Sequence, residues 1–361
     1  MRRKRLTDMN SNSIKTPGKQ IDYLSFASVV SALAVVFLHA NGCFWTFSAT
    51  AKYWKVANVI ECVFYFAVPV FFMISGATLL DFYKRYGLKE YFRKRVQKTV
   101  IPYLVWSLLG IAIRLFYWKS IQPDDVTPQF IVNALLSGKA TDVYWFFIPL
   151  FCIYLSIPLF AAVAEDKRVV VFQYLAIAGF ILNCLIPFLL SLFHVSVSYE
   201  FSVSAVAGYL LFVILGYLLT HCALSPGARY LLYALSVAAF LVHLIGTYQA
   251  SMEAGALVKT YKGYLNVPSI VYSVGIFVFF RYAGERLMQV SLISKLVNFL
   301  KDYTFSLYLL HIFILRTILK VFPVTSKSMS YRLGAPFATL AVTVLVTWLI
   351  RKIPVLRKTL P

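Results

Sequence analysis

The stretch LSFASVVSALAVVFLHANGC, from Leu24 to Cys43, is 20 residues long and carries one basic side chain, that of His39. A run of this length and apolarity is enough to cross a hydrocarbon layer of about 30 Å as one α-helix. An ionisable group in hydrocarbon is costly, so such residues are rare, face the protein interior and commonly serve transport or chemistry. The stretch therefore predicts a membrane helix with a functional histidine.

Similar apolar runs recur along the chain. Of its 361 residues 60% are hydrophobic and 14% are charged, and the mean hydropathy is +0.75, far from an ordinary soluble domain. In lipid the backbone must satisfy its own hydrogen bonds, and apolar runs of about 20 residues favour helices over barrel strands. The sequence predicts an all-α polytopic bundle of ten membrane helices, over residues 24–44, 57–80, 99–117, 142–162, 169–191, 200–220, 228–248, 264–280, 302–321 and 336–350.

Basic residues orient this bundle. With the amino terminus inside, the inner segments carry 24 Lys and Arg and the outer loops carry 8, so the positive-inside rule predicts that both termini are cytoplasmic. The net charge of +21 then comes mainly from the basic residues of the cytoplasmic segments. No nucleic-acid partner is expected, because no basic face with base-contacting motifs occurs. We expect a basic tail over 1–20, a membrane domain over 21–351 and a short cytoplasmic tail over 352–361.

Depth places several ionisable side chains in one layer. His39 lies about five residues before the outer end of the first helix and Glu61 about four residues after the outer start of the second, which puts both roughly 6 to 8 Å below the outer interface. By the same counting, Arg114, His243 and Arg316 fall in the outer third. Five helices contribute to this layer, which predicts a buried polar pocket that opens outward.

A histidine beside a carboxylate is a general-base arrangement. Glu61 would fix the tautomer of His39 and leave the other ring nitrogen to take a proton from an attacking hydroxyl. The structural alternative is an ion pair between Glu61 and Arg114, with His39 hydrogen-bonded to a backbone carbonyl.

Transport paths use the same residue types, so a carrier of a small polar solute or glycan precursor is the alternative function. No inverted repeat relates the two halves of the sequence, as it does in many carriers.

Six segments resemble the bacterial acyltransferase family 3 membrane proteins. Their joint order and spacing carry the resemblance, which extends over all ten predicted helices. They are IDYLSFASVVSALAVVFLHANG (21–42), FYFAVPVFFMISGATLL (64–80), YFRKRVQKTVIPYLVW (91–106), VYWFFIPLFCIYLSIPLF (143–160), GYLLFVILGYLL (208–219) and YTFSLYLLHIFIL (303–315).

The resemblance implies an integral-membrane O-acyltransferase of the bacterial plasma (inner) membrane. Such proteins generally transfer acetyl from cytoplasmic acetyl-CoA to a hydroxyl of a cell-surface polysaccharide or related glycan. The resemblance also implies that His39 is the central catalytic residue, which would act either as a general base or through a covalent acetyl-histidine intermediate. One position departs from the family pattern, because Ser28 stands where an arginine or lysine is common, 11 residues before the histidine, and we assign no donor contact to it.

The segment from Lys84 to Lys98 is the candidate site for the acyl donor. Arg95 and Lys98 match the basic pair that the family places after its second helix. A guanidinium can hold a phosphate bidentately and an ammonium acts as a point charge, so we expect this pair to bind the phosphates of CoA. A cytoplasmic loop is basic whatever it binds, which is the structural alternative. The pantetheine arm would pass between the first three helices to His39.

Other residues have supporting roles in this hypothesis. Arg114 or the amide of Asn41 would stabilise the oxyanion, and Arg316 would line the acceptor pocket. Trp145 would line it too, although an interfacial aromatic belt also predicts a tryptophan at this position. His311 is expected to be structural or accessory, by hydrogen-bonding across helices. The five cysteines have no paired metal-ligand spacing, so no metal and no tightly bound cofactor is expected. The expected partners are acyl-CoA, the glycan acceptor and membrane lipids.

Overall fold

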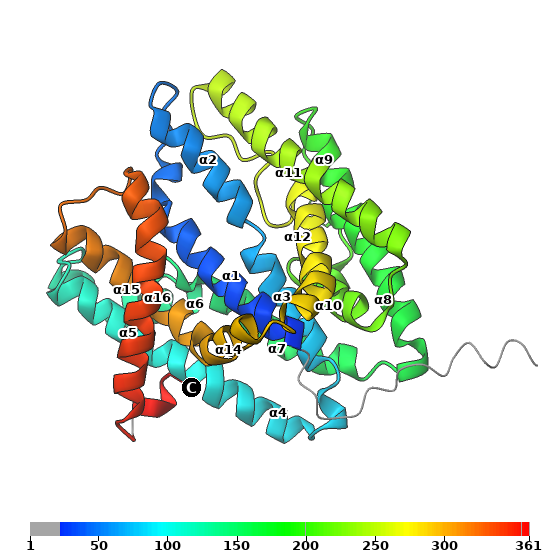
Figure 1. Ribbon diagram of the computed structural model, residues 1–361, viewed down its shortest axis with the longest axis horizontal. Helices are drawn as coiled ribbons and strands as arrows, with labels where there is room; N and C mark the ends of the chain where they lie inside the picture. Colours follow the sequence, from blue (N-terminus) through cyan, green and yellow to red (C-terminus); the bar gives the residue numbers. More distant parts are fainter. Residues whose placement is uncertain (1–21, 199, 355, 361) are drawn as a thin grey trace, which may run out of the picture.

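A computed structural model describes residues 22–198, 200–354 and 356–360. Within these residues the chain forms helices and no strands (Figure 1), which confirms the prediction of an all-α fold. The predicted basic tail over 1–20 lies outside the described residues.

The α-helices are joined by turns, short loops and one-turn helices. Three single π-turns, η3 (Val96–Val100), η6 (Ile181–Leu185) and η8 (Phe280–Gly284), join neighbouring helices end to end. The α-helices are α1 (Asp22–Ala40), α2 (Lys52–Phe64), α3 (Ala67–Leu79), α4 (Leu88–Arg95), α5 (Ile101–Phe116), α6 (Pro128–Ser137), α7 (Phe147–Ala161), α8 (Glu165–Phe180), α9 (Ile186–Ser191), α10 (Leu210–His221), α11 (Pro226–Ala254), α12 (Val267–Phe279), α13 (Glu285–Leu287), α14 (Ser291–Leu300), α15 (Thr304–Val321) and α16 (Met329–Arg351).

Nine helical segments in the described part of the chain are long and apolar enough to cross a membrane. The tenth prediction, over 200–220, is wrong in length, because α10 has only 12 residues. At about 1.5 Å per residue it is too short for a layer of about 30 Å. Before it the backbone makes a 3-10 turn at Ser204–Val206 and takes a left-handed conformation at Gly208, with φ of 60°. These turns end the helix that continuous apolarity predicts.

Helix α1 runs through the middle of the bundle (Figure 1). It packs against α2, α3, α15 and α16, and most of its residues are buried. Its buried residues include several alanines and serines, small side chains that let membrane helices approach closely. The central position of α1 keeps His39 among protein neighbours.

Two glycines bring α3 and α10 into close contact. A Cβ added at Gly76 would lie 1.8 Å from the carbonyl oxygen of Val213, and one at Gly216 would lie 2.0 Å from that of Met73. No side chain fits at either distance, so the two helices pack backbone against backbone.

The Gly216→Ala variant is therefore expected to be less stable, by about 1–3 kcal/mol, because α10 must move away from α3 to admit a methyl group. The thermal midpoint of the purified protein in detergent measures this effect. Gly227→Ala is the matched control, since nothing lies within 4 Å of a Cβ added there. Equal midpoints for Gly216→Ala and the wild type would contradict the close approach.

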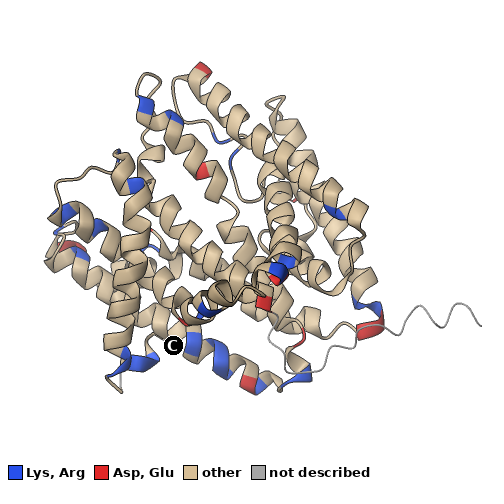
Figure 2. Ribbon diagram, viewed as in Figure 1, with Lys and Arg blue, Asp and Glu red and all other residues tan. Residues whose placement is uncertain are grey.

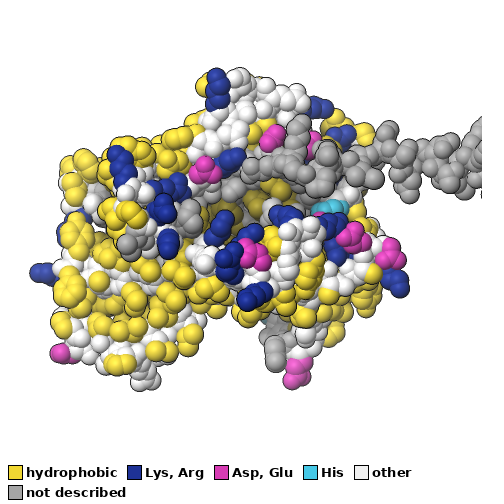
Figure 3. Space-filling model, turned by 90° about the horizontal axis from the view of Figure 1, so that it is seen from below, with side chains coloured by type: hydrophobic (Ala, Val, Ile, Leu, Met, Phe, Trp, Pro, Cys, Tyr) yellow, Lys and Arg dark blue, Asp and Glu magenta, His cyan; other side chains and the backbone are white. Residues whose placement is uncertain are grey.

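Basic side chains gather at one end of the bundle. Figure 2 shows Lys and Arg along α4 and close to the C-terminus, at the lower edge of the view. Figure 3 looks onto this end and shows Lys and Arg over its middle. This gathering is what the positive-inside rule predicts for a cytoplasmic face, and we call this the inner end and the opposite one the outer end.

Candidate active site

His39 of α1 lies beside a second histidine. Its ring centroid is 5.0 Å from that of His311 in α15, and the two ring planes are inclined by 38°. His311 is fully buried, whereas His39 keeps part of its surface accessible. Helices α1 and α15 pack against each other. The neighbour of the predicted catalytic histidine is therefore an imidazole on a facing helix.

The tautomer of His311 follows from its backbone contacts. Its Nδ1 lies 3.1 Å from the carbonyl oxygen of Leu307 and 2.7 Å from that of Tyr308. Carbonyl oxygens only accept hydrogen bonds, so Nδ1 carries the hydrogen, and Nε2 of the neutral ring carries a lone pair. This Nε2 is buried and has no hydrogen-bond partner within the described residues. An unused acceptor thus lies in the core near His39.

Glu61 is paired with Lys262, a residue that no sequence motif singles out. Lys262 Nζ lies 2.7 Å from Glu61 Oε1, and the two side chains are 0% and 4% exposed. Asn41 Nδ2 lies 3.5 Å from the other carboxylate oxygen. Among the described residues no hydrogen bond joins Glu61 to His39 and no ion pair joins it to Arg114. The expected contact between Glu61 and His39 is therefore replaced by one with Lys262.

Lys262 reaches Glu61 from the loop between α11 and α12. Its Nζ lies 3.7 Å from the ring centroid of Tyr65 and 4.7 Å from that of Phe44, so aromatic faces add cation–π attraction to the ion pair. Burial lowers the pKa of Lys262, and the Glu61 carboxylate acts in the opposite sense. The contact ties the loop to α2. The sequence signal for Lys262 was its position, because the positive-inside rule makes a lysine in an outer loop unexpected.

Most cations of the inner basic segment have partners already. Lys84 contacts Asp81 and Glu165, Arg85 donates to the carbonyl of Thr78, and Arg93 and Lys94 both contact Glu90. These contacts leave them less free to bind a ligand.

Arg95 and Lys98 differ from these neighbours, because neither has an acidic partner in the part of the chain that the structure describes. The Arg95 guanidinium lies 5.8 Å from the ring centroid of Tyr91 and 5.4 Å from that of Tyr154. Its Nε is buried and makes no hydrogen bond within the described residues. Lys98 is exposed and lies in the π-turn η3 that follows α4. That this pair binds the phosphates of CoA stays a prediction.

A family model described as an acyltransferase domain matches residues 21–351, nearly the whole chain. The chain belongs to acyltransferase family 3. It is a multi-pass membrane acyltransferase, as the resemblance implied. No curated protein and no solved structure matches it.

Two expected pocket residues of this acyltransferase contact loop residues near the outer end. Arg114 Nη1 donates to the carbonyl oxygens of Lys139 and Ala140, at 3.1 and 3.2 Å. Arg316 forms an ion pair with Asp142, and these side chains are 36% and 67% exposed. No hydrogen bond within the described residues joins either arginine to His39. Their proposed roles at the oxyanion and the acceptor stay predictions.

Asn41 lies beside the buried ion pair, and Trp145 is linked to it through two tyrosine rings. The Asn41 side chain donates to the carbonyl oxygen of Ala57 at 2.8 Å, which occupies the amide that was expected to stabilise the oxyanion. Trp145 stacks on Tyr264 with a centroid distance of 5.8 Å, and Tyr264 stacks on Tyr65 at 4.4 Å. Trp145 thus belongs to an aromatic stack that ends at the ring beneath Lys262.

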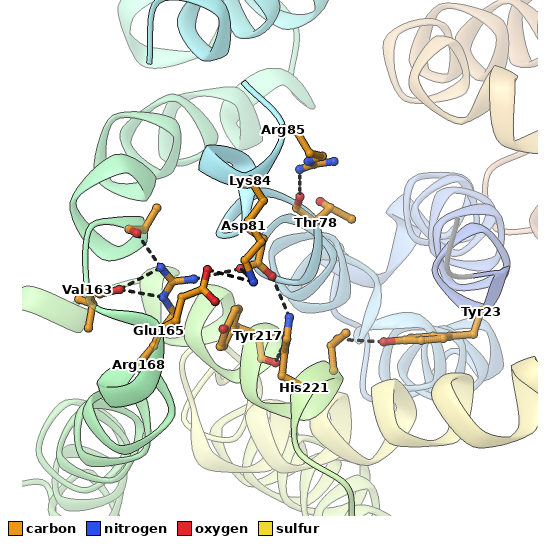
Figure 4. Close-up of polar contacts among 12 residues, drawn as sticks. Tyr23, Thr78, Asp81, Lys84, Arg85, Val163, Glu165, Arg168, Tyr217 and His221 are labelled. Carbon is orange, nitrogen blue, oxygen red and sulfur yellow. Dashed lines mark hydrogen bonds and ion pairs between the residues drawn. The ribbon is translucent and has the colours of Figure 1, made fainter. Parts of the chain in front are cut away.

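The Asp81 carboxylate contacts three basic side chains at the inner end (Figure 4). Its carboxylate lies 3.0 Å from Arg168 Nη1, 2.9 Å from His221 Nε2 and 3.4 Å from Lys84 Nζ. Arg168 also donates to the carbonyl oxygen of Ala161 at 2.7 Å. These residues join the ends of α3, α8 and α10, so the network fixes helix ends. No group of three His, Cys, Asp or Glu side chains that could hold a metal occurs within the described residues.

Proposed function

We propose that this membrane acyltransferase transfers acetyl from cytoplasmic acetyl-CoA to a hydroxyl of a cell-surface polysaccharide or related glycan, at the bacterial plasma membrane. The observation that carries the proposal is the position of His39. It lies on the central helix of an acyltransferase-family bundle, partly accessible and beside His311. An imidazole held in this way is suited to act as a general base.

His39 removes the proton of the acceptor hydroxyl as the hydroxyl oxygen attacks the thioester carbonyl. The tetrahedral intermediate then collapses, the carbon–sulfur bond breaks, and the proton on His39 passes to the sulfur of CoA. The products are an acetyl ester and free CoA. General acid–base catalysis of this kind contributes about 10²–10⁴-fold to a rate.

Unpartnered hydroxyls support a path for the donor arm. Thr339, Thr343 and Thr347 recur every four residues along α16, are fully buried, and have no hydrogen-bond partner in the described chain. Ser31 of α1 and Ser306 of α15 share these properties, and the three helices pack together. The amides of pantetheine need hydrogen-bond partners away from water. These hydroxyls favour a path along α16 over the expected path between the first three helices.

The Arg95→Gln variant is expected to raise the KM for acetyl-CoA by roughly 10- to 100-fold with little change in kcat, because it removes a charged hydrogen bond worth about 1.5–3 kcal/mol. Initial rates at varied acetyl-CoA concentration measure this effect. Arg93→Gln is the matched control, since its guanidinium already binds Glu90. If Arg95→Gln and Arg93→Gln give the wild-type KM, the donor phosphates bind elsewhere.

A groove near the outer end supports access of the acceptor. Its volume is about 590 Å³, and its lining includes Arg114, Asn133, Ser137 and Lys139. These polar side chains suit the hydroxyls of a sugar. The groove lies where α5 meets the loop segment that contains α6.

Labelled acetyl-CoA distinguishes this proposal from transport. The purified protein in detergent is given [¹⁴C]acetyl-CoA together with envelope glycan extracted from a strain that lacks the gene. We expect alkali-labile label in the glycan, although no sealed compartment is present. A pure carrier would leave the glycan unlabelled, and that result would reject the proposed function.

A further inference from the structure

We infer that His311 is the positioning residue for His39, in the place that sequence reasoning gave to Glu61. This inference rests on the proposed function, in which His39 is the general base. The Nε2 atom of His311 accepts a hydrogen bond from one ring nitrogen of His39. The other nitrogen of His39 then carries the lone pair that receives the proton of the acceptor hydroxyl.

The hydrogen-bonding state of His311 makes it suitable for this role. Two backbone carbonyls of its own helix hold the hydrogen on Nδ1, so the neutral ring presents only an acceptor at Nε2. A buried acceptor without a partner is unfavourable by about 1–3 kcal/mol. An N–H of the neighbouring His39 ring can donate a hydrogen bond to this nitrogen. The same hydrogen bond would fix the tautomer of His39.

The position of the two rings allows the contact to form. Their centroids are 5.0 Å apart, and rotation of the partly accessible His39 ring turns an N–H toward His311. The two nitrogens are not hydrogen-bonded in the described structure. Catalytic hydrogen bonds are often long without substrate and tighten when it binds.

Glu61, the other candidate for positioning His39, is already held in an ion pair. The Glu61 carboxylate is held by Lys262 at 2.7 Å, and within the described residues no carboxylate forms an ion pair with His39. A neutral imidazole also differs from a carboxylate in its effect. It brings no further charge into the core, and its hydrogen bond strengthens as His39 becomes an imidazolium during attack.

Two substitutions at His311 test the inference. Leucine removes the acceptor while filling much of the space, and glutamine places a side-chain oxygen near the position of Nε2. We expect His311→Leu to lower kcat at least about 100-fold with the KM for acetyl-CoA within about twofold, and His311→Gln to recover most of this loss. His194→Gln is the control, because His194 is an exposed histidine in the segment that follows α9. It should keep wild-type kcat.

A spectroscopic readout separates positioning from packing. In protein labelled with ¹⁵N-histidine, the His39 signals, assigned by their loss in His39→Gln, should report one tautomer in the wild type and a mixture in His311→Leu. Full kcat in His311→Leu, or equal losses in the leucine and glutamine variants with an unchanged His39 tautomer, would overturn the inference. Full activity in His39→Gln would instead reject the proposed function itself.

Discussion

Cells whose only copy of this gene encodes His39→Ala are expected to lack the envelope acetyl ester that the wild-type gene restores. Alanine has no group that can accept the proton of the hydroxyl, so the transfer rate should fall at least about 100-fold. The measurement is mass spectrometry of envelope glycan from a deletion strain that carries either gene, with the ester identified by its loss in mild alkali.

His194→Ala is the matched control for this experiment, because His194 is exposed in the segment that follows α9. Both variants should reach wild-type abundance in the membrane, measured by immunoblot. Normal ester content in His194→Ala and none in His39→Ala is the expected pattern. Equal ester content in His39→Ala and the wild type would show that His39 is not the base.

Lys262→Met is expected to cause the largest loss of stability. The substitution leaves the Glu61 carboxylate buried without its partner, and breaking a buried ion pair in this way costs about 3–5 kcal/mol. The thermal midpoint of the purified protein in detergent should fall accordingly. Lys259→Met is the matched control, because Lys259 lies in the same loop but is exposed, and its midpoint should stay near that of the wild type.

The double variant Glu61→Gln with Lys262→Met tests the cause of this loss. It removes the stranded charge and should recover part of the lost stability, since replacing both members of a buried pair is far less harmful than removing one. If the double variant is as unstable as the sum of the single variants, the loss does not come from an unpaired carboxylate.

Length and apolarity were enough to predict most of the membrane helices. The run that contains His39 forms α1 over Asp22–Ala40, close to its predicted bounds. The same reasoning overestimated α10, because the segment before it is apolar enough for lipid but turns at Gly208. Hydropathy does not show where the backbone turns, and Ser204, Ala205 and Ala207 of this segment are exposed.

The partners of the buried charges could not be predicted in the same way. Counting residues gives the depth of Glu61 along its helix but not the direction in which its side chain points. Its partner Lys262 is 201 residues away in sequence and comes from a loop, where depth counting does not apply. His39 and His311 likewise meet only because α15 packs against α1. The sequence therefore identified the residue types of the site, but only the folded structure shows which of them form pairs.

Proteoliposomes test the central claim most directly, namely that the acetyl group crosses the bilayer at His39. The protein is reconstituted with envelope glycan from the deletion strain sealed inside, and [¹⁴C]acetyl-CoA is added outside. We predict alkali-labile label in the enclosed glycan with the wild type and none with His39→Ala. Label that appears only when donor and glycan share one compartment would contradict this account.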